Sequence, residues 1–192
     1  MDDLAEAVLA FWFGAPGSPE RGTPRPEWFR KDPAFDEEIR RRFGDPVAIA
    51  LAGGFGAWCA SAEGALARIL LLDQFTRNIH RGSPLAFAGD ARALATAEDA
   101  IGRGFDLALP PSERRFVYMP FEHAEDVAAQ HRSLELFAAL SKDLGDDEAL
   151  VWARKHAEVI FRFGRYPHRN AILGRVSTPD EEAYLREPGS GF

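Results

Sequence analysis

The chain has 192 residues, of which 46% are hydrophobic and 28% are charged, and its formal net charge at pH 7 is −7. This composition is ordinary for a globular protein, and the length fits one domain with a sizeable core. The negative balance argues against binding of nucleic acid or of an anionic membrane through the surface as a whole.

Cysteine usage and the N-terminus predict a cytoplasmic protein. Cys59 is the one cysteine, so no disulfide can form within the chain. The chain begins Met1-Asp2-Asp3, which is acidic where a secretory signal is basic. The apolar run at 7–13 is too short to span a bilayer, so no membrane association is expected.

Helix start signals recur along the chain, each a capping residue followed by proline: Asp32-Pro33, Asp45-Pro46, Ser83-Pro84 and Thr178-Pro179. Thr178 with Glu181 also fits a capping box. No window alternates as a strand does, so the predicted fold class is all-α, one compact domain over residues 1–192. We predict helices at 2–13, 33–43, 46–52, 61–80, 84–103, 111–121, 122–144, 147–163 and 178–187, a surface loop at 13–27 and a flexible tail at 188–192.

Short connections between these helices predict antiparallel helix hairpins. His123-Ala124-Glu125 recurs as His156-Ala157-Glu158, 33 residues later, a period that suits stacked helix pairs of the tetratricopeptide kind. The predicted helix 122–144 is apolar on two sides, with Leu134 on one and Leu136 on the other, as an inner helix of a stacked array requires. The sequence therefore predicts a tetratricopeptide-like helical array.

Polar side chains interrupt the apolar stripe of the predicted helix 61–80. Asp73 and Arg77 continue the stripe of Leu66, Ile69 and Leu70, and they are four residues apart, so they can pair directly. The pair is either a buried ion pair that ties two helices together or the wall of a polar pocket. Gln74 and Asn78 lie on an adjacent face, where they can orient a ligand or a backbone group.

Two further segments place histidines among apolar residues. His156 is central to a stripe formed by Ala149, Trp152, Val159, Ile160 and Phe163, so we expect a buried imidazole that is a core residue, a pocket residue or a metal ligand. Pro120 is expected to kink or restart the helix just before Glu122 and His123. This junction is either a site with two titratable side chains or a helix break that Glu122 closes.

The segment 163–175 is the most polar connection in the chain. It holds Arg165, Tyr166, His168, Arg169 and Asn170 after Gly164 and Pro167 have ended the preceding helix. From Leu150 to Arg175 there are six basic residues and one acidic residue, a local charge of +5. These arginines either bind an anion or neutralise Asp73 and Glu122 and cap helix ends.

The common motifs for nucleotides, for zinc and for serine hydrolysis do not occur in the sequence. We therefore predict no cofactor and no metal site. Cys59 has no base nearby in the sequence, so a structural role is expected for it.

Several segments resemble the bacterial domain-of-unknown-function family 924. The resemblance rests on Asp73-Gln74-Phe75-Thr76-Arg77-Asn78, on Tyr118-Met119-Pro120-Phe121-Glu122-His123, on residues 163–175 and 177–179, and on the opening Val8-Leu9-Ala10-Phe11-Trp12-Phe13. Thr76 stands where the pattern has proline. The resemblance implies an all-helical fold similar to tetratricopeptide repeats, and it implies no established activity and no catalytic residues.

Two hypotheses about function follow. In the first, the polar residues wall a pocket for a small anionic ligand, and Glu122, His123, His156 or His168 moves a proton in a possible enzymatic reaction. In the second, the same residues form a structural network in a scaffold whose concave face binds a peptide or protein. Whether the chain is an enzyme, and how it associates with copies of itself, are left open by the sequence.

Overall fold

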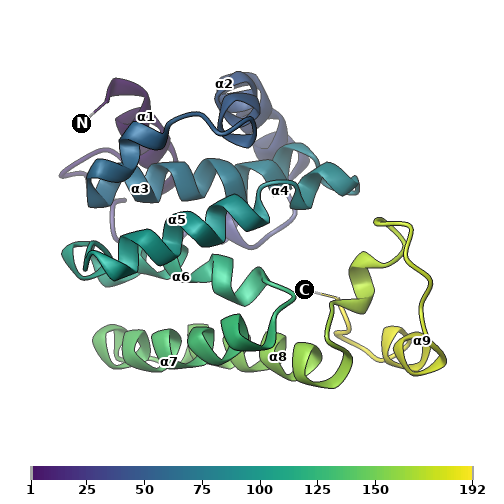
Figure 1. The fold of residues 1–192 in the computed structure, drawn as a ribbon. Helices are drawn as coiled ribbons and strands as arrows, with labels where there is room; N and C mark the ends of the chain where they lie inside the picture. The colour runs from purple at the N-terminus through teal and green to yellow at the C-terminus, as the bar shows by residue number, and fades with distance from the viewer. Residues whose placement is uncertain (1, 192) are drawn as a thin grey trace.

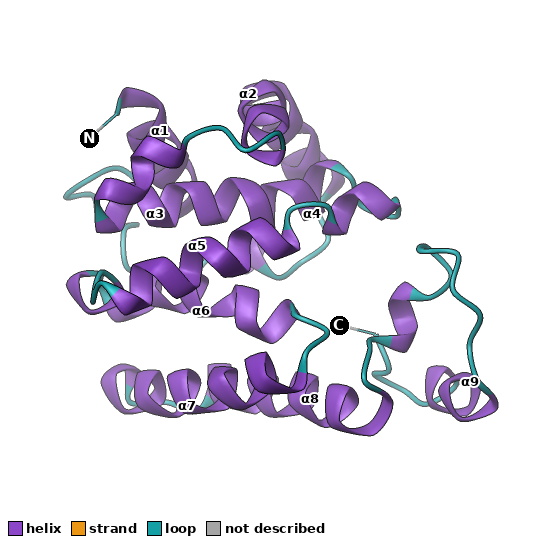
Figure 2. Cartoon of the chain, in the orientation of Figure 1, coloured by secondary structure: helices purple, strands orange, loops and turns teal. Residues whose placement is uncertain are grey.

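All regular elements of the computed structural model, which describes residues 2–191, are helical (Figures 1 and 2). The all-α prediction is confirmed. The α-helices are α1 (Asp3–Phe13), α2 (Pro33–Leu51), α3 (Ala62–Ile69), α4 (Thr76–Ile79), α5 (Asp90–Gly102), α6 (Pro111–His123), α7 (Val127–Leu144), α8 (Glu148–Phe163) and α9 (Pro179–Leu185). The π-helical segment Leu70–Phe75 joins α3 to α4, and 3-10 turns lie at Pro26–Trp28, Gly56–Ala60, Pro84–Phe87, Asp106–Ala108 and Pro167–Arg169.

The helices are stacked in the order of the chain. In Figure 1, α1 and α2 lie at one end, α3 to α6 in the middle, and α7 and α8 at the other end, while the segment that carries α9 stands at one side. Three residues join α6 to α7 and three join α7 to α8, so these neighbours run antiparallel as expected. A tetratricopeptide-like array stays a prediction.

Several predicted helix starts are confirmed by their caps. The Asp32 carboxylate accepts hydrogen bonds from the backbone of Ala34 and Phe35, and Thr178 with Glu181 forms a complete capping box at α9. The helix start predicted at Asp45-Pro46 is wrong, because α2 continues through Pro46. Ile39, Phe43, Val47 and Ala50 form one continuous buried stripe, and its burial outweighs the backbone hydrogen bond that Pro46 cannot donate.

The helix break expected at Pro120 is also wrong in its position. The helix α6 passes through Pro120 and ends at His123, and α7 begins only at Val127, where Asp126 caps it through the backbone of Ala129. The break falls here because the cap satisfies one end and Gln130 satisfies the other, by donating to the carbonyls of Glu122 and Ala124.

Other boundaries differ by a few residues. The predicted helix 84–103 is a 3-10 turn followed by α5. The predicted loop 13–27 is shorter than expected, because α1 includes residue 13 and the 3-10 turn Pro26–Trp28 includes residues 26 and 27. The predicted tail 188–192 contains no helix as far as residue 191, and residue 192, like residue 1, lies outside the described residues. Trp152 was expected in the buried stripe of α8 but is 40% exposed and stacks with Lys155, because the apolar face of α8 packs on α6 and α7.

Aromatic rings form the centre of the core. Trp12 contacts Trp28, Phe75 and Phe116 with ring centroids 5.4 to 6.2 Å apart, so α1, the loop after it, the π-helical segment and α6 meet at one point. A second, small cluster of Val159, Ile160 and Tyr166 holds the chain that follows α8. None of the described helices has both the length and the apolar character of a membrane-spanning segment.

Gly89 sets the distance between α5 and the π-helical segment. A Cβ atom at this position would lie 2.0 Å from the carbonyl oxygen of Leu72, which is far closer than atoms approach in proteins. Glycine is therefore the residue that lets the first turn of α5, and Asp90 with it, reach the π-helical segment.

We expect Gly89→Ala to lower the free energy of unfolding by about 1–3 kcal/mol, because the added methyl group must push α5 away. The measurement is urea denaturation. Gly102→Ala, at the end of the same helix, is the matched control, since its Cβ would meet nothing within 4 Å. Equal stability of the Gly89 variant and the control would contradict the close contact.

Candidate functional site

A π-helical turn places Asp73 in the centre of the molecule. The backbone N–H of Thr76 donates to the carbonyl of Leu71, five residues earlier, and the hydroxyl of Thr76 donates to the same oxygen over 2.8 Å. This widened turn inserts one extra residue into the helix, a feature that is frequent at functional sites. Asp73 lies within it and is fully buried.

The carboxylate of Asp73 is shared by three side chains. Arg77 Nη1 lies 2.9 Å from Oδ1, His123 Nδ1 lies 2.6 Å from the same oxygen, and the amide of Gln74 contacts the other oxygen. Burial alone would raise the pKa of this carboxyl, but the charges of Arg77 and His123 and these hydrogen bonds hold it well below its usual range. Asp73 is therefore ionised, and the predicted pairing with Arg77 is confirmed.

Asp90 extends this arrangement towards the segment after α8. Its carboxylate, in the first turn of α5, lies 2.9 Å from Arg77 Nη1 and 3.1 Å from Arg169 Nη1. We call Asp73, Arg77, Asp90, His123 and Arg169 the central cluster. Its two guanidinium groups and two carboxylates alternate, so their formal charges cancel.

Arg169 is buried between two rings, with 6% of its surface exposed. Its guanidinium carbon lies 4.6 Å from the ring centres of Phe87 and of Tyr166, and Nη2 donates to the backbone carbonyl of His123 over 3.0 Å. Its Nε is buried and has no hydrogen-bond acceptor among residues 2–191. The arginine thus joins three parts of the fold and keeps one unused donor.

His123 has one fixed and one open nitrogen. The ionised Asp73 can only accept, so the network assigns the ring proton to Nδ1 and leaves the lone pair on Nε2. Nε2 makes no hydrogen bond to the described chain, and the side chain as a whole is 12% exposed. Burial, and then the charge of Arg77, lower the pKa of His123 against the opposing effect of Asp73, which favours a neutral ring.

A second imidazole lies beside the first. His156 Nδ1 lies 2.7 Å from Glu122 Oε1, and the rings of His123 and His156 are 6.2 Å apart in a T-shaped arrangement. His156 is buried, as the sequence predicts.

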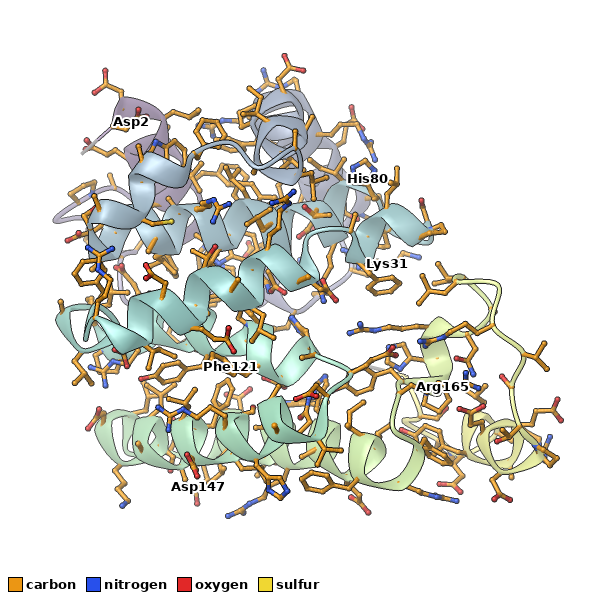
Figure 3. All side chains as sticks on the ribbon, viewed as in Figure 1. Asp2, Lys31, His80, Phe121, Asp147 and Arg165 are labelled. Atoms are coloured by element: carbon orange, nitrogen blue, oxygen red, sulfur yellow. The ribbon has the colours of Figure 1, made fainter. Side chains whose placement is uncertain are left out.

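The residues predicted in segment 163–175 divide into two groups. Arg165 binds Glu181 through two hydrogen bonds of 2.6 and 2.8 Å, and Asn170 binds Ser177 and Glu181, so both hold the segment to α9. Tyr166 and Arg169 reach the rest of the molecule instead: the Tyr166 hydroxyl donates to the carbonyl of Glu122. Burial raises the pKa of Tyr166, so the hydroxyl keeps its proton. Figure 3 shows side chains filling the space between α6 and the segment that carries Arg165.

Two of the predicted site residues, Asn78 and His168, are not part of the central cluster. The Asn78 amide donates to Asp36 on α2 over 2.7 Å, in a separate group that Arg81 completes. His168 stacks near Tyr166, with ring centres 5.5 Å apart. Burial, followed by the charge of Arg169 and the neighbouring His156, lowers the pKa of His168 to about 4.

The sequence interpretation missed Asp90 and Glu125, and it included Arg175 without identifying its partner. Arg175 binds Glu125 through hydrogen bonds of 2.6 and 2.8 Å, which fastens the segment to the turn between α6 and α7. Asp90 had one usable signal, since an acidic residue directly after a glycine marks a helix start. Glu125 and Arg175 are 50 residues apart, and no local pattern connects them.

Two surface hollows, of about 520 and 320 Å³, lie near the N-terminus. They are lined by residues such as Gly14 and Arg25 in the first and Ala5 and Trp58 in the second, and neither touches the central cluster. Within the described residues, no group of three or more His, Cys, Asp or Glu side chains is arranged to hold a metal ion.

Comparisons with known proteins agree on one relationship. Residues 8–189 match the model of the family described as "Bacterial protein of unknown function (DUF924)". The solved structure of ATU0120, a protein of unknown function from Agrobacterium tumefaciens, is similar over 96% of this chain and 97% of that chain, with 41% identity and a TM-score of 0.83. No match was found among curated proteins.

We expect Arg169→Ala to lower the free energy of unfolding by about 3 kcal/mol, because the change removes one partner of a buried ion pair. This value is the low end of the usual loss of stability for such a change, because Asp90 still pairs with Arg77 in the variant. Urea denaturation measures the effect, and Arg162→Ala, at an exposed arginine that stacks on the rings of Phe163 and Tyr184, should change stability by less than about 0.5 kcal/mol. A loss no larger than that of the control would mean that the pairing is not stabilising.

The partly buried His168 should make the protein acid-sensitive. Its pKa falls from 6.5 to about 4 on folding, so the unfolded chain binds more protons between these values and stability is lost as the pH falls. This group alone should remove roughly 3 kcal/mol between pH 6.5 and pH 4. Urea denaturation at pH 7 and pH 4.5 should show a smaller difference for His168→Gln than for the unchanged protein, and equal differences would refute the assignment.

Proposed function

The chain belongs to DUF924, a bacterial family of unknown function, and we propose that its central cluster binds a small ligand with a single negative charge and that His123 removes a proton from it. One observation carries the proposal. The Nδ1 atom of His123 is fixed 2.6 Å from the fully buried carboxylate of Asp73, while Nε2 makes no hydrogen bond to the described residues.

A fixed imidazole of this kind suits general-base catalysis. The ionised Asp73 holds the ring in one orientation and one tautomer and stabilises the positive charge that the ring gains with a proton. The lowered pKa of His123 keeps the ring neutral at neutral pH, so its lone pair is available. The fixed orientation comes from Asp73 in the π-helical turn, whereas the lowered pKa of His123 comes from burial and the charge of Arg77.

The charges of the central cluster limit the ligand. Arg77 and Arg169 carry +2 and Asp73 and Asp90 carry −2, so with a neutral His123 ring the sum is zero. His123 is also the last residue of α6, where the helix dipole is negative. A doubly charged phosphate is disfavoured there, whereas the unused N–H groups of Arg77 and Arg169 can satisfy one carboxylate. A small hydroxycarboxylate carries one negative charge on its carboxylate and has a hydroxyl proton that His123 can remove.

The alternative function is a scaffold for a peptide or protein, in which the polar residues are structural. The mutual pairing of Arg165 with Glu181 and of Arg175 with Glu125 favours a structural role for the outer residues. It does not account for His123, whose fixed orientation leaves Nε2 without a partner in the described chain.

We expect a small hydroxycarboxylate to raise the melting temperature of the protein in a thermal-shift panel of hydroxycarboxylates, phosphates and short acidic peptides. A ligand at 100 times its Kd should add about 2.7 kcal/mol to the free energy of unfolding. The shift should disappear in His123→Gln and persist in His131→Gln, the same change at an exposed histidine of α7. A panel in which only peptides act, or a shift that survives in His123→Gln, would favour the scaffold.

A further inference from the structure

Asp90 bridges two arginines in the way that a bound carboxylate ligand bridges them. Its Oδ2 accepts hydrogen bonds from Arg77 Nη2 and from Arg169 Nη1, each over 3.1 Å. Its Oδ1 lies 2.9 Å from Arg77 Nη1 but accepts no hydrogen bond within residues 2–191. Part of the accepting capacity of this carboxylate is therefore unused.

The two carboxylates of the central cluster are enclosed to different degrees. The side chain of Asp73 is 1% exposed and lies inside the π-helical turn, whereas that of Asp90 is 20% exposed. Arg77 pairs with both carboxylates. Of the two, Asp90 is therefore the carboxylate that a ligand from solvent can meet.

An aromatic ring keeps water from the two arginines. The guanidinium carbon of Arg169 lies 4.6 Å, and that of Arg77 5.8 Å, from the ring centre of Phe87, which stands three residues before Asp90. The buried Nε of Arg169 has no acceptor within the described residues. Charges act strongly on one another where water is excluded. One unit of charge at Asp90 therefore changes the affinity for an anion by a large factor.

Resting on the proposed function, we propose that Asp90 is the specificity-determining residue that restricts the cluster to ligands with one negative charge. With two guanidinium groups and two carboxylates the cluster has a formal charge of zero, so a bound monoanion brings it to −1 and a dianion to −2. The site therefore accepts hydroxy monocarboxylates and excludes hydroxy dicarboxylates and phosphates, because Asp90 occupies the place of the second negative charge.

Removal of the charge of Asp90 should reverse this restriction. Two guanidinium groups and the one carboxylate of Asp73 add up to +1, so a dianion brings the cluster of such a variant to −1. This is the same final charge that a monoanion gives in the unchanged protein. The variant should therefore bind dianions that the unchanged protein rejects.

Asparagine at position 90 removes the charge and keeps the shape of the side chain. In the variant Arg77 retains Asp73 as its partner, and Arg169 retains the backbone carbonyl of His123. Neither guanidinium is thus left without an acceptor, so the arginines should keep their places.

The test measures the Kd of lactate, malate and inorganic phosphate by titration calorimetry at about pH 8, where malate and phosphate carry two negative charges. Lactate and malate share a hydroxyl next to a carboxylate and differ by the second carboxylate. We expect the unchanged protein to bind lactate at least about 100-fold more tightly than malate or phosphate. Asp90→Asn should bind malate and phosphate at least about 100-fold more tightly than the unchanged protein does, a larger gain than for lactate, because the repulsion that is removed grows with the ligand charge.

Three further variants separate charge from structure. Asp99→Asn is the matched control, since it removes the same charge from an exposed side chain of the same helix, and it should change each Kd by less than about twofold. Asp90→Glu keeps the charge and should keep the preference for lactate. Asp90→Ser removes the charge with a smaller side chain and decides the question if Asp90→Asn does not fold.

Failure of this inference and failure of the proposed function give different results. Lactate binding that is lost in His123→Gln, with malate and phosphate affinities that Asp90→Asn does not raise, keeps the proposed function and rejects Asp90 as the charge-selecting residue. An equal gain in Asp99→Asn also rejects it, because the effect is then that of net charge. Absence of lactate binding rejects the proposed ligand, while dianion binding gained in Asp90→Asn would still assign the charge restriction to Asp90.

Discussion

The buried carboxylate of Asp73 is the constraint around which the centre of the molecule is arranged. An ionised carboxylate away from water costs several kcal/mol unless other groups compensate its charge and its lone pairs. Arg77 comes from the same helical stretch, but His123 comes from α6, and Arg77 in turn needs Asp90 from α5. Satisfying one buried charge therefore fixes the relative positions of three helical elements, and Arg169 adds the segment after α8.

The pairing of arginines with carboxylates also determines which polar groups remain for ligand binding. Most of the arginines that give residues 150–175 their positive charge are matched by carboxylates from elsewhere in the chain, on α9 for Arg165 and in the turn between α6 and α7 for Arg175. The local excess of charge in the sequence is thus no measure of anion affinity in the folded protein. What the pairing leaves available is the oriented imidazole of His123 and a few unused N–H groups.

Much of the fold could be predicted from local patterns, and the errors have a common cause. Capping residues marked the starts of α2 and α9 correctly, yet Pro46 and Pro120 were given too much weight as helix breakers. A proline removes one backbone hydrogen bond, and a long buried stripe such as that of α2 outweighs the loss. The π-helical turn at Asp73 left no periodic signal, because one extra residue in a short segment does not change the apolar pattern enough to detect.

The sequence by itself determined the all-helical class, the pairing of Asp73 with Arg77 and the burial of His156, because all three follow from spacing along one helix. Only the tertiary structure decided that His123 is held by Asp73, that Asp90 lies between two arginines and that Glu122 faces His156. These contacts join residues from different helices, and their distances depend on how the helices pack. Helical periodicity specifies which face of a helix is buried, and packing specifies which residue that face meets.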